Sequence, residues 1–270
     1  MSLASIAVPF VKASACGNDF LLIDARELDP VLIPQLPSIS RRMCNRHDGI
    51  GADGVEWIYP HASADAEIRL MNADGSTAEI SGNGTRCVAA LIAAERRKEK
   101  IAIQTGAGLK VCTLISKNEN AHEFEAEMGK AVVGAELRLP LADGETRGIP
   151  VSMGNPHYVV FGNDFPANWR ERAAAIQRSP KFPEGVNVEF VTSLGQHDIQ
   201  VRFFERGAGE TQSSGTGSCA AAVASVADSG GASLIRVHSP GGVQTVRLED
   251  DTVFLRGWAR LVCHGEFYLS

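Results

Sequence analysis

The stretch Asn72–Cys87, NADGSTAEISGNGTRC, joins a turn to the start of a helix. Asp74-Gly75 favours a tight bend after an expected strand at Glu67–Met71. Ser81-Gly82-Asn83-Gly84 leads into Thr85–Lys98, an alanine-rich run that predicts a helix. Glycines before a helix let the backbone approach a ligand, and the helix start favours an anion such as a carboxylate or a phosphate. For one such loop, a plain helix cap is the alternative.

The same device occurs twice. Ser214-Gly215-Thr216-Gly217 precedes the helix-favouring run Ala220–Ala224, and Ser214 follows Ser81 by 133 positions. A second pair supports the repeat, because Gly154-Asn155-Pro156-His157 follows Gly17-Asn18-Asp19-Phe20 by 137 positions, and both precede apolar runs. Two devices repeated at nearly one interval predict two related halves that face each other across a cleft.

Composition excludes several classes of protein. With 270 residues, a net charge of −6 and a pI near 5.7, the chain gives no reason to expect nucleic acid or an anionic membrane as partner. The N-terminus does not resemble a secretory signal, and no apolar run approaches a membrane span, so a cytoplasmic location is expected. The six cysteines show no CxxC spacing and the histidines no ligand-like spacing, so neither a metal site nor disulfides are expected.

The pattern of strands and helices predicts an α+β fold. We expect two pseudo-symmetric halves, each a mainly antiparallel sheet wrapped around a long central helix, with the active site in the cleft between them. The predicted N-terminal half is 1–127, completed by a last strand at about 259–270, and the C-terminal half is 128–258. Gly129–Pro150 shows turn residues and little periodicity, so the join is placed there. A further helix is predicted at Asn168–Arg178, with Asp164 or Asn168 as its cap.

Two helix starts aimed at one point would hold a small carboxylate and stabilise charge that develops when a proton leaves the neighbouring carbon. To invert that carbon, one group removes the proton from one face and another returns it on the opposite face. Ser81 and Ser214 are at the expected positions for these two groups, but the pKa of a serine hydroxyl is too high for a base at neutral pH. A thiol has a pKa near 8.5, whereas an alcohol lies several units higher and needs an adjacent base.

These motifs together resemble the diaminopimelate epimerase family, in family order over nearly the whole chain. The residues that carry the resemblance are Asn72–Gly75, Ser81–Cys87, Met153–His157, Phe182–Val188 and Glu205–Thr211, with Gly17–Phe20, Arg46-His47, Gly51–Gly54 and Pro240–Gly242 in agreement. The resemblance implies two pseudo-symmetric α/β halves and cofactor-independent conversion of LL-diaminopimelate to the meso form, a precursor of lysine and peptidoglycan. It implies a small amino acid as substrate and no nucleic acid or membrane partner, and it leaves a homodimer open.

The resemblance also assigns roles to residues. Ser81 and Ser214 fall on the catalytic positions, which are cysteine in the family, and His157 and Glu205 fall on their polar neighbours. Glu205 also forms the family's substrate-gripping pair with Arg206. The other positions expected to contact substrate are Asn18, Asn72, Gly82, Asn83, Asn155, Asn187, Gly215 and Thr216.

Three interpretations of the serines stay open. They are engineered replacements that trap substrate, or natural residues of a member that works differently or on another small carboxylate, or marks of a non-catalytic amino-acid-binding protein. The intact asparagines and the Glu205-Arg206 pair weigh against a decayed binder, since drift would have changed them too. Cys87 and Cys219 lie beyond the helix starts, where packing is the better interpretation.

Overall fold

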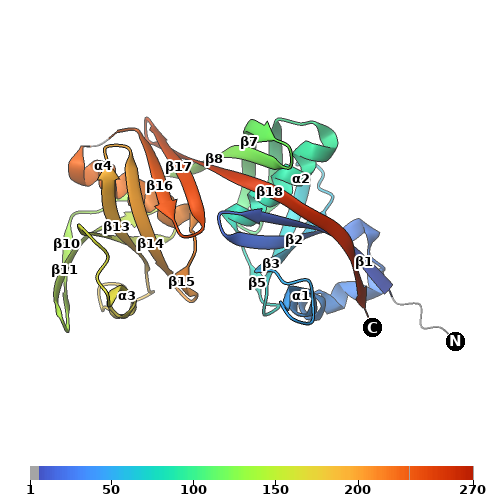
Figure 1. The fold of residues 1–270 in the computed structure, drawn as a ribbon, viewed down its shortest axis with the longest axis horizontal. Coiled ribbons are helices and arrows are strands. Elements are labelled where there is room, and N and C mark those ends of the chain that lie inside the picture. The colour runs from blue at the N-terminus through green and yellow to red at the C-terminus, as the bar shows by residue number, and fades with distance from the viewer. Residues whose placement is uncertain (1–5, 231, 270) are drawn as a thin grey trace. The chain divides into compact units, whose positions relative to one another are not determined.

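The computed structural model describes residues 6–230 and 232–269, and the chain divides into two compact units (Figure 1). Unit 1 comprises Met1–Ala126 and Gly257–Ser270, and unit 2 comprises Glu127–Arg256. Two strands run from one unit into the other: β8 (Ala121–Lys130) and β18 (Thr252–Leu269).

Strands outnumber helices in both units. The other elements of unit 1 are β1 (Ile6–Ala15), β2 (Asn18–Asp24), η1 (Ala25–Glu27), η2 (Pro30–Gln35), α1 (Leu36–Cys44), β3 (Gly54–Tyr59), β4 (Ala66–Asn72), β5 (Thr77–Ala78), α2 (Gly82–Arg96), β6 (Lys100–Thr105) and β7 (Gly108–Asn118). Those of unit 2 are β9 (Val132–Val133), β10 (Leu137–Leu141), β11 (Gly144–Ser152), β12 (Pro156–Phe161), α3 (Trp169–Gln177), β13 (Asn187–Gly195), β14 (Asp198–Glu205), β15 (Gly209–Thr211), α4 (Gly215–Ser229), β16 (Leu234–Ser239) and β17 (Gly242–Glu249).

The two units repeat one pattern of strand pairing. In unit 1, β2 pairs with β1 antiparallel and with β3 in parallel, and β4 pairs with β3 antiparallel and with β6 in parallel. In unit 2, β12 and β14 have the corresponding partners: β11 and β13 for β12, and β13 and β16 for β14. Each sheet is therefore mixed, with antiparallel pairs in the majority. The register gives matching positions, because Leu22 opposes Glu56 in unit 1 and Val159 opposes Glu189 in unit 2.

A 15-residue, alanine-rich helix packs into the core of each unit, α2 in unit 1 and α4 in unit 2. Alanine favours the helix, and its small side chain lets the backbone lie close to the sheet. Buried residues of α2, such as Val88 and Ile92, join one cluster with Ile68 and Ile101 from neighbouring strands. In unit 2, α4 forms the equivalent cluster with β11, β14, β16 and β17. Both helices end at a residue in the left-handed conformation, Arg97 after α2 and Gly230 after α4.

Alternation along the central strands builds a second core on the opposite face of each sheet. In β3, Val55 and Trp57 pack with α1 and η2, so Glu56 points to the α2 side of the sheet. In β13, Val188 and Phe190 pack with α3, which places Glu189 on the α4 side. Each sheet is thus covered on both faces and buries one glutamate beneath its longer helix.

The structure corrects three details of the sequence prediction. Each unit has a second helix of nine residues, α1 or α3, so a single long central helix does not describe either half. The stretch Gly129–Pro150 was expected to be turn-rich, yet it contains the hairpin of β10 and β11. Asn168 stands at the N-cap of α3, but its side chain makes no capping bond in the described chain and instead donates to Asp143. Among the described residues, no helix is long and apolar enough to cross a membrane.

Candidate active site

Ser81 is the N-cap of α2, as the glycine-punctuated loop predicts. Its backbone is extended, and its Oγ accepts a hydrogen bond from Gly84 N at 3.1 Å. This bond satisfies one of the N–H groups that lack an intrahelical partner at a helix start. The Ser81 side chain is half-buried, so the hydroxyl stands at the positive end of the α2 dipole.

The predicted asparagines of unit 1 are organised around this helix start. Asn83 Nδ2 donates to Asn18 Oδ1 at 2.7 Å, and the buried guanidinium of Arg86 donates to Asn83 Oδ1. Asn18 Nδ2 donates in turn to Asp53 Oδ2 at 3.1 Å. The structure therefore brings Asn18 and Asn83 together with the start of α2 and fixes the orientation of both amides.

Asn72 occupies a turn and is engaged locally. It ends β4, and its Nδ2 donates to Ser76 Oγ at 3.0 Å. Gly75 in this turn has φ +82°, a conformation that suits glycine, so the expected bend after the strand is confirmed. No hydrogen bond between Asn72 and Ser81 occurs in the described part of unit 1.

Ser214 repeats the cap at the start of α4. Its Oγ accepts from Gly217 N at 3.2 Å, and its hydroxyl also donates to Glu205 Oε2 at 3.3 Å. Glu205 Oε1 accepts a second bond from Thr211 Oγ1 at 2.6 Å. The resemblance implied that Glu205 is a polar neighbour of the two catalytic positions, and in the structure Glu205 contacts Ser214.

His157 sits in a buried chain of polar groups beside α4. Asn155 Nδ2 donates to Thr216 Oγ1 at 3.3 Å, which leaves Asn155 Oδ1 to accept from His157 Nε2 at 3.0 Å. His157 Nδ1 lies 2.8 Å from Glu189 Oε1, and both side chains are fully buried. Burial raises the pKa of Glu189, while His157 acts in the opposite direction. The pair therefore holds a proton between Nδ1 and Oε1 in a site without water access.

Asn187 and Arg206 lie together at the ends of β13 and β14. Asn187 Oδ1 accepts from Arg206 N at 2.9 Å, and its Nδ2 donates to Pro156 O at 3.1 Å. The Arg206 guanidinium reaches Glu184 O at 2.7 Å and is otherwise exposed. Asn187 thus joins Arg206 to the first residue of β12, directly before His157, and the guanidinium has donors left for a ligand.

Sequence reasoning missed the two glutamates beneath the helix starts. Both oxygens of Glu56 are buried without a hydrogen-bond partner in the described structure, and burial raises its pKa to about 8. Glu189 occupies the matching position under α4, 133 positions later. The available signal was a glutamate inside an apolar strand of each half, at the same interval as Ser81 and Ser214.

Each unit therefore presents a helix start, a capping serine and oriented asparagines within one small region. Such a region can bind a carboxylate and stabilise negative charge next to it. The serine hydroxyl supplies a proton donor or acceptor at the same place, and in unit 2 the adjacent Glu205 can take its proton. Proton transfer at a carbon next to a carboxylate requires these groups: an anion-binding helix start and an acid or base beside it.

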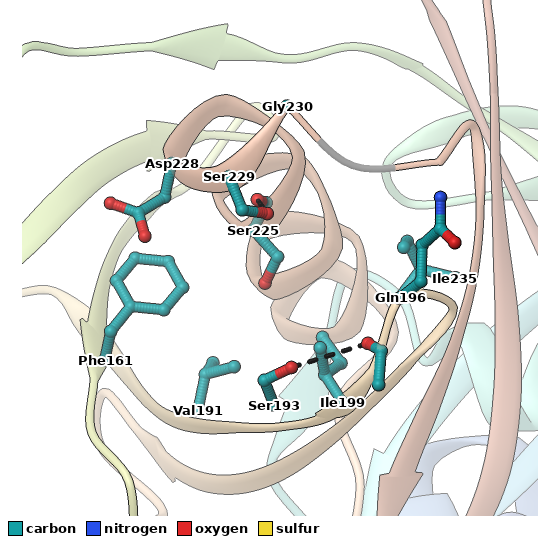
Figure 2. Close-up of a pocket in the computed structure, with 11 residues that line it drawn as sticks. Phe161, Val191, Ser193, Gln196, Ile199, Ser225, Asp228, Ser229, Gly230 and Ile235 are labelled. Carbon is teal, nitrogen blue, oxygen red and sulfur yellow. Dashed lines mark hydrogen bonds between the residues drawn. The ribbon is translucent and has the colours of Figure 1, made fainter.

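A separate pocket of about 340 Å³ lies at the other end of α4 (Figure 2). Its lining is largely apolar, with Phe161, Val191 and Ile235, and it contains none of the predicted site residues. Its serine hydroxyls are engaged, since Ser225 donates to Ala221 O at 2.7 Å and Ser193 to Gly195 O at 3.4 Å. Its carboxylate, Asp228, is paired with Arg147 at 2.5 Å.

Comparison with known proteins agrees with these features. The profile of the family described as diaminopimelate epimerase matches residues 10–134 and 149–262. Curated diaminopimelate epimerases of Desulfitobacterium hafniense and Pelotomaculum thermopropionicum are 34% and 36% identical to the chain. The first alignment covers 94% of this chain and 96% of its relative, and the second covers 96% and 98%.

Solved structures share the fold at lower sequence identity. A Bacillus anthracis phenazine biosynthesis protein of the PhzF family has a TM-score of 0.74 at 15% identity, over 98% of this chain and 100% of that protein. A hydroxyproline epimerase from Agrobacterium vitis, with bound trans-4-hydroxy-L-proline, has a TM-score of 0.69 at 16% identity, over 98% and 92%. The family match and the near-full-length relatives show that this chain belongs to the diaminopimelate epimerase family.

Proposed function

We propose that this protein is built to epimerise LL-diaminopimelate to meso-diaminopimelate without a cofactor, with Ser81 and Ser214 at the two base positions. One serine would remove the α-proton from one face of the carbon, and the other would return a proton to the opposite face.

The observation that carries the proposal is the duplicated helix start. Ser81 and Ser214 cap equivalent helices with equivalent bonds, to Gly84 N and Gly217 N. Two groups of the same kind at matched positions suit a reaction that is chemically symmetric about one carbon. The relatives that bear the name diaminopimelate epimerase support this substrate over other amino acids.

The distal end of the substrate would be held by Asn72, Asn187 and Arg206. A guanidinium fork suits a carboxylate, and the Arg206 guanidinium is exposed with donors left over. Calorimetry tests this assignment, because diaminopimelate should bind more tightly than lysine, which lacks the distal carboxylate. Equal affinity for the two ligands would reject it.

Serine limits the expected rate. A helix dipole contributes about 0.3–2 kcal/mol, and one pKa unit corresponds to about 1.4 kcal/mol, so the dipole cannot bring an alcohol into the range of a thiol. We therefore expect the chain as it stands to turn over slowly or not at all. The double variant S81C/S214C should epimerise faster by orders of magnitude, and each single variant should recover much less.

The measurement is α-proton exchange in deuterated water, followed by NMR on LL- and meso-diaminopimelate. Fast exchange in the serine form, equal to that of S81C/S214C, would show that other residues supply the bases. Binding of diaminopimelate with no exchange in any form would favour a non-catalytic amino-acid-binding protein. Exchange on another small carboxylate alone would favour a racemase of different specificity.

A further inference from the structure

Glu56 is a buried acid that the proposed mechanism leaves unused. It lies on β3 beneath the start of α2, is 0% exposed, and has neither oxygen bonded in the described structure. A Cβ atom added to Gly84 would lie 2.0 Å from Glu56 Oε1 and 3.3 Å from Ser81 Cβ. The carboxyl group and the capping serine therefore adjoin the same point at the helix start.

Comparison with unit 2 shows that Ser81 has no bonded carboxylate in the described structure. Ser214 donates to Glu205, the residue that ends β14. The corresponding strand of unit 1 ends at Asn72, which lies 133 positions before Glu205 and is an amide, unable to accept a proton. Among the residues described, Ser81 thus lacks the bond to a carboxylate that Ser214 has, and the buried Glu56 lies beside the start of α2.

We propose that Glu56 is the proton-exchange partner of Ser81, and that it acts through the Ser81 hydroxyl. When the Ser81 O–H bond breaks, its proton moves to the substrate α-carbon, whose electron pair forms the new C–H bond. The Glu56 O–H bond then breaks as its proton moves to Ser81 Oγ, which leaves Glu56 as a carboxylate. In the reverse direction Ser81 takes the α-proton and passes its own to the Glu56 carboxylate.

The surroundings of Glu56 favour a protonated resting state. Its register neighbours are Leu22 on β2 and Leu70 on β4, both apolar. On α2, the guanidinium of Arg86 is turned to Asn83 and Cys16, and burial raises the pKa of the Cys87 thiol. Desolvation is accordingly the cause that raises the pKa of Glu56 to about 8. An acid with a pKa close to the working pH suits proton exchange in both directions.

One movement is required, because Ser81 Oγ now accepts from Gly84 N. The hydroxyl must turn toward Glu56, and hydrogen bonds of this kind often tighten only when substrate is bound. Gly84 leaves the space for this approach, since any larger residue there would meet the Glu56 carboxyl.

The test rests on the proposed function and uses the full chain in two backgrounds. In S214C, the thiol makes one face competent, so the Ser81 step limits conversion of the LL form to the meso form, which needs both faces. There E56Q should slow this conversion by about 10- to 100-fold and remove the contribution of Glu56 to its pH dependence between about 6 and 9. In S81C/S214C, a thiol replaces the hydroxyl and needs no relay, so E56Q should change the conversion by less than about threefold.

The matched control is E67Q, the same chemical change on the neighbouring strand β4, which should leave both backgrounds unchanged. If E56Q slows both backgrounds equally, or neither, Glu56 has only a structural role and the relay is rejected. An inactive S81C/S214C form would instead reject the proposed function, and the relay with it. The two failures are thereby distinguished.

Discussion

The starts of α2 and α4 are built alike and differ in how each accommodates a buried glutamate. Under α4, Glu189 faces His157 Nδ1 at 2.8 Å. Under α2, the residue matching His157 is Phe20, which opposes Gly54 as His157 opposes Asn187, and Glu56 has no partner in the described chain. The two units therefore bury a carboxyl group in different ways. In unit 2 the glutamate shares a proton with a histidine, and in unit 1 it is a neutral, protonated acid.

The same contrast extends to the serines. Ser214 has a carboxylate at hydrogen-bond distance, Glu205, and Ser81 has the amide Asn72 at the matching place. The acid of unit 2 is the last residue of β14, whereas the acid of unit 1 lies within β3, beneath the helix. A duplicated fold thus keeps the anion-binding helix start and lets the proton-handling groups diverge.

Replacing the histidine that pairs with Glu189 should produce the largest change in the free energy of unfolding. His157→Phe gives unit 2 the arrangement of unit 1 and leaves Glu189 buried alone. The loss at pH 8 should be about 3–5 kcal/mol of unfolding free energy, the range for breaking a buried pair. Without His157 the pKa of Glu189 rises further above its unfolded value, so the folded state keeps a proton that the unfolded state releases. Stability should fall as pH rises, and the loss should shrink near pH 5.

Urea unfolding of His157→Phe at pH 5 and pH 8 is the measurement. The matched comparison is Phe20→His, which offers Glu56 a partner and should make the stability of unit 1 less dependent on pH. A loss from His157→Phe that is the same at both pH values would mean that packing, not the proton, sets the cost.

Replacing Glu56 should produce the second-largest effect, a change in how the free energy of unfolding depends on pH. Its pKa is raised from 4.5 to about 8, so its contribution to stability is fully present below pH 4.5 and is lost as pH rises through about 8. The slope in that window is about 1.4 kcal/mol per pH unit at most. Glu56→Gln removes the titrating proton and should flatten this dependence. A wild-type chain whose unfolding free energy does not decline between pH 5 and pH 8 would contradict a neutral Glu56.

Replacing either capping serine should produce the smallest change in the free energy of unfolding. Ser81→Ala and Ser214→Ala each remove one cap bond, a loss of about 1 kcal/mol. Ser214→Ala should cost somewhat more, by up to about 1 kcal/mol, because it also removes the bond to Glu205. Thermal unfolding of the two variants side by side measures the difference. A larger loss from Ser81→Ala would mean that Ser81 makes contacts beyond its cap.

Much of this molecule was readable from local sequence. The glycine loops predicted both helix starts, because Ser81 and Ser214 are strong caps and alanine-rich runs follow them. The nearly equal spacing of the two repeated motifs predicted the duplication, and the motifs together predicted the family. These features depend on residues that are neighbours in the sequence and on motifs that repeat along it, so both can be recognised without the structure.

Other features escaped the sequence because they depend on residues distant along the chain. The hairpin of β10 and β11 has weak periodicity of its own, and it forms because β12 and α3 cover its apolar side chains, such as Leu139. The contact of Asn187 with Arg206 requires the register of β13 on β14.

The amino-acid sequence alone determined where the helices begin, which residues cap them, and that the fold is repeated. Only the tertiary structure decided the protonation of the two buried glutamates. Glu56 and Glu189 are identical in type and in strand position, but the parallel neighbour strand brings the His157 imidazole to Glu189, whereas that strand carries Phe20 at the matching position in unit 1. A carboxyl group responds to the charges and hydrogen bonds that surround it in space, and strand pairing sets those surroundings.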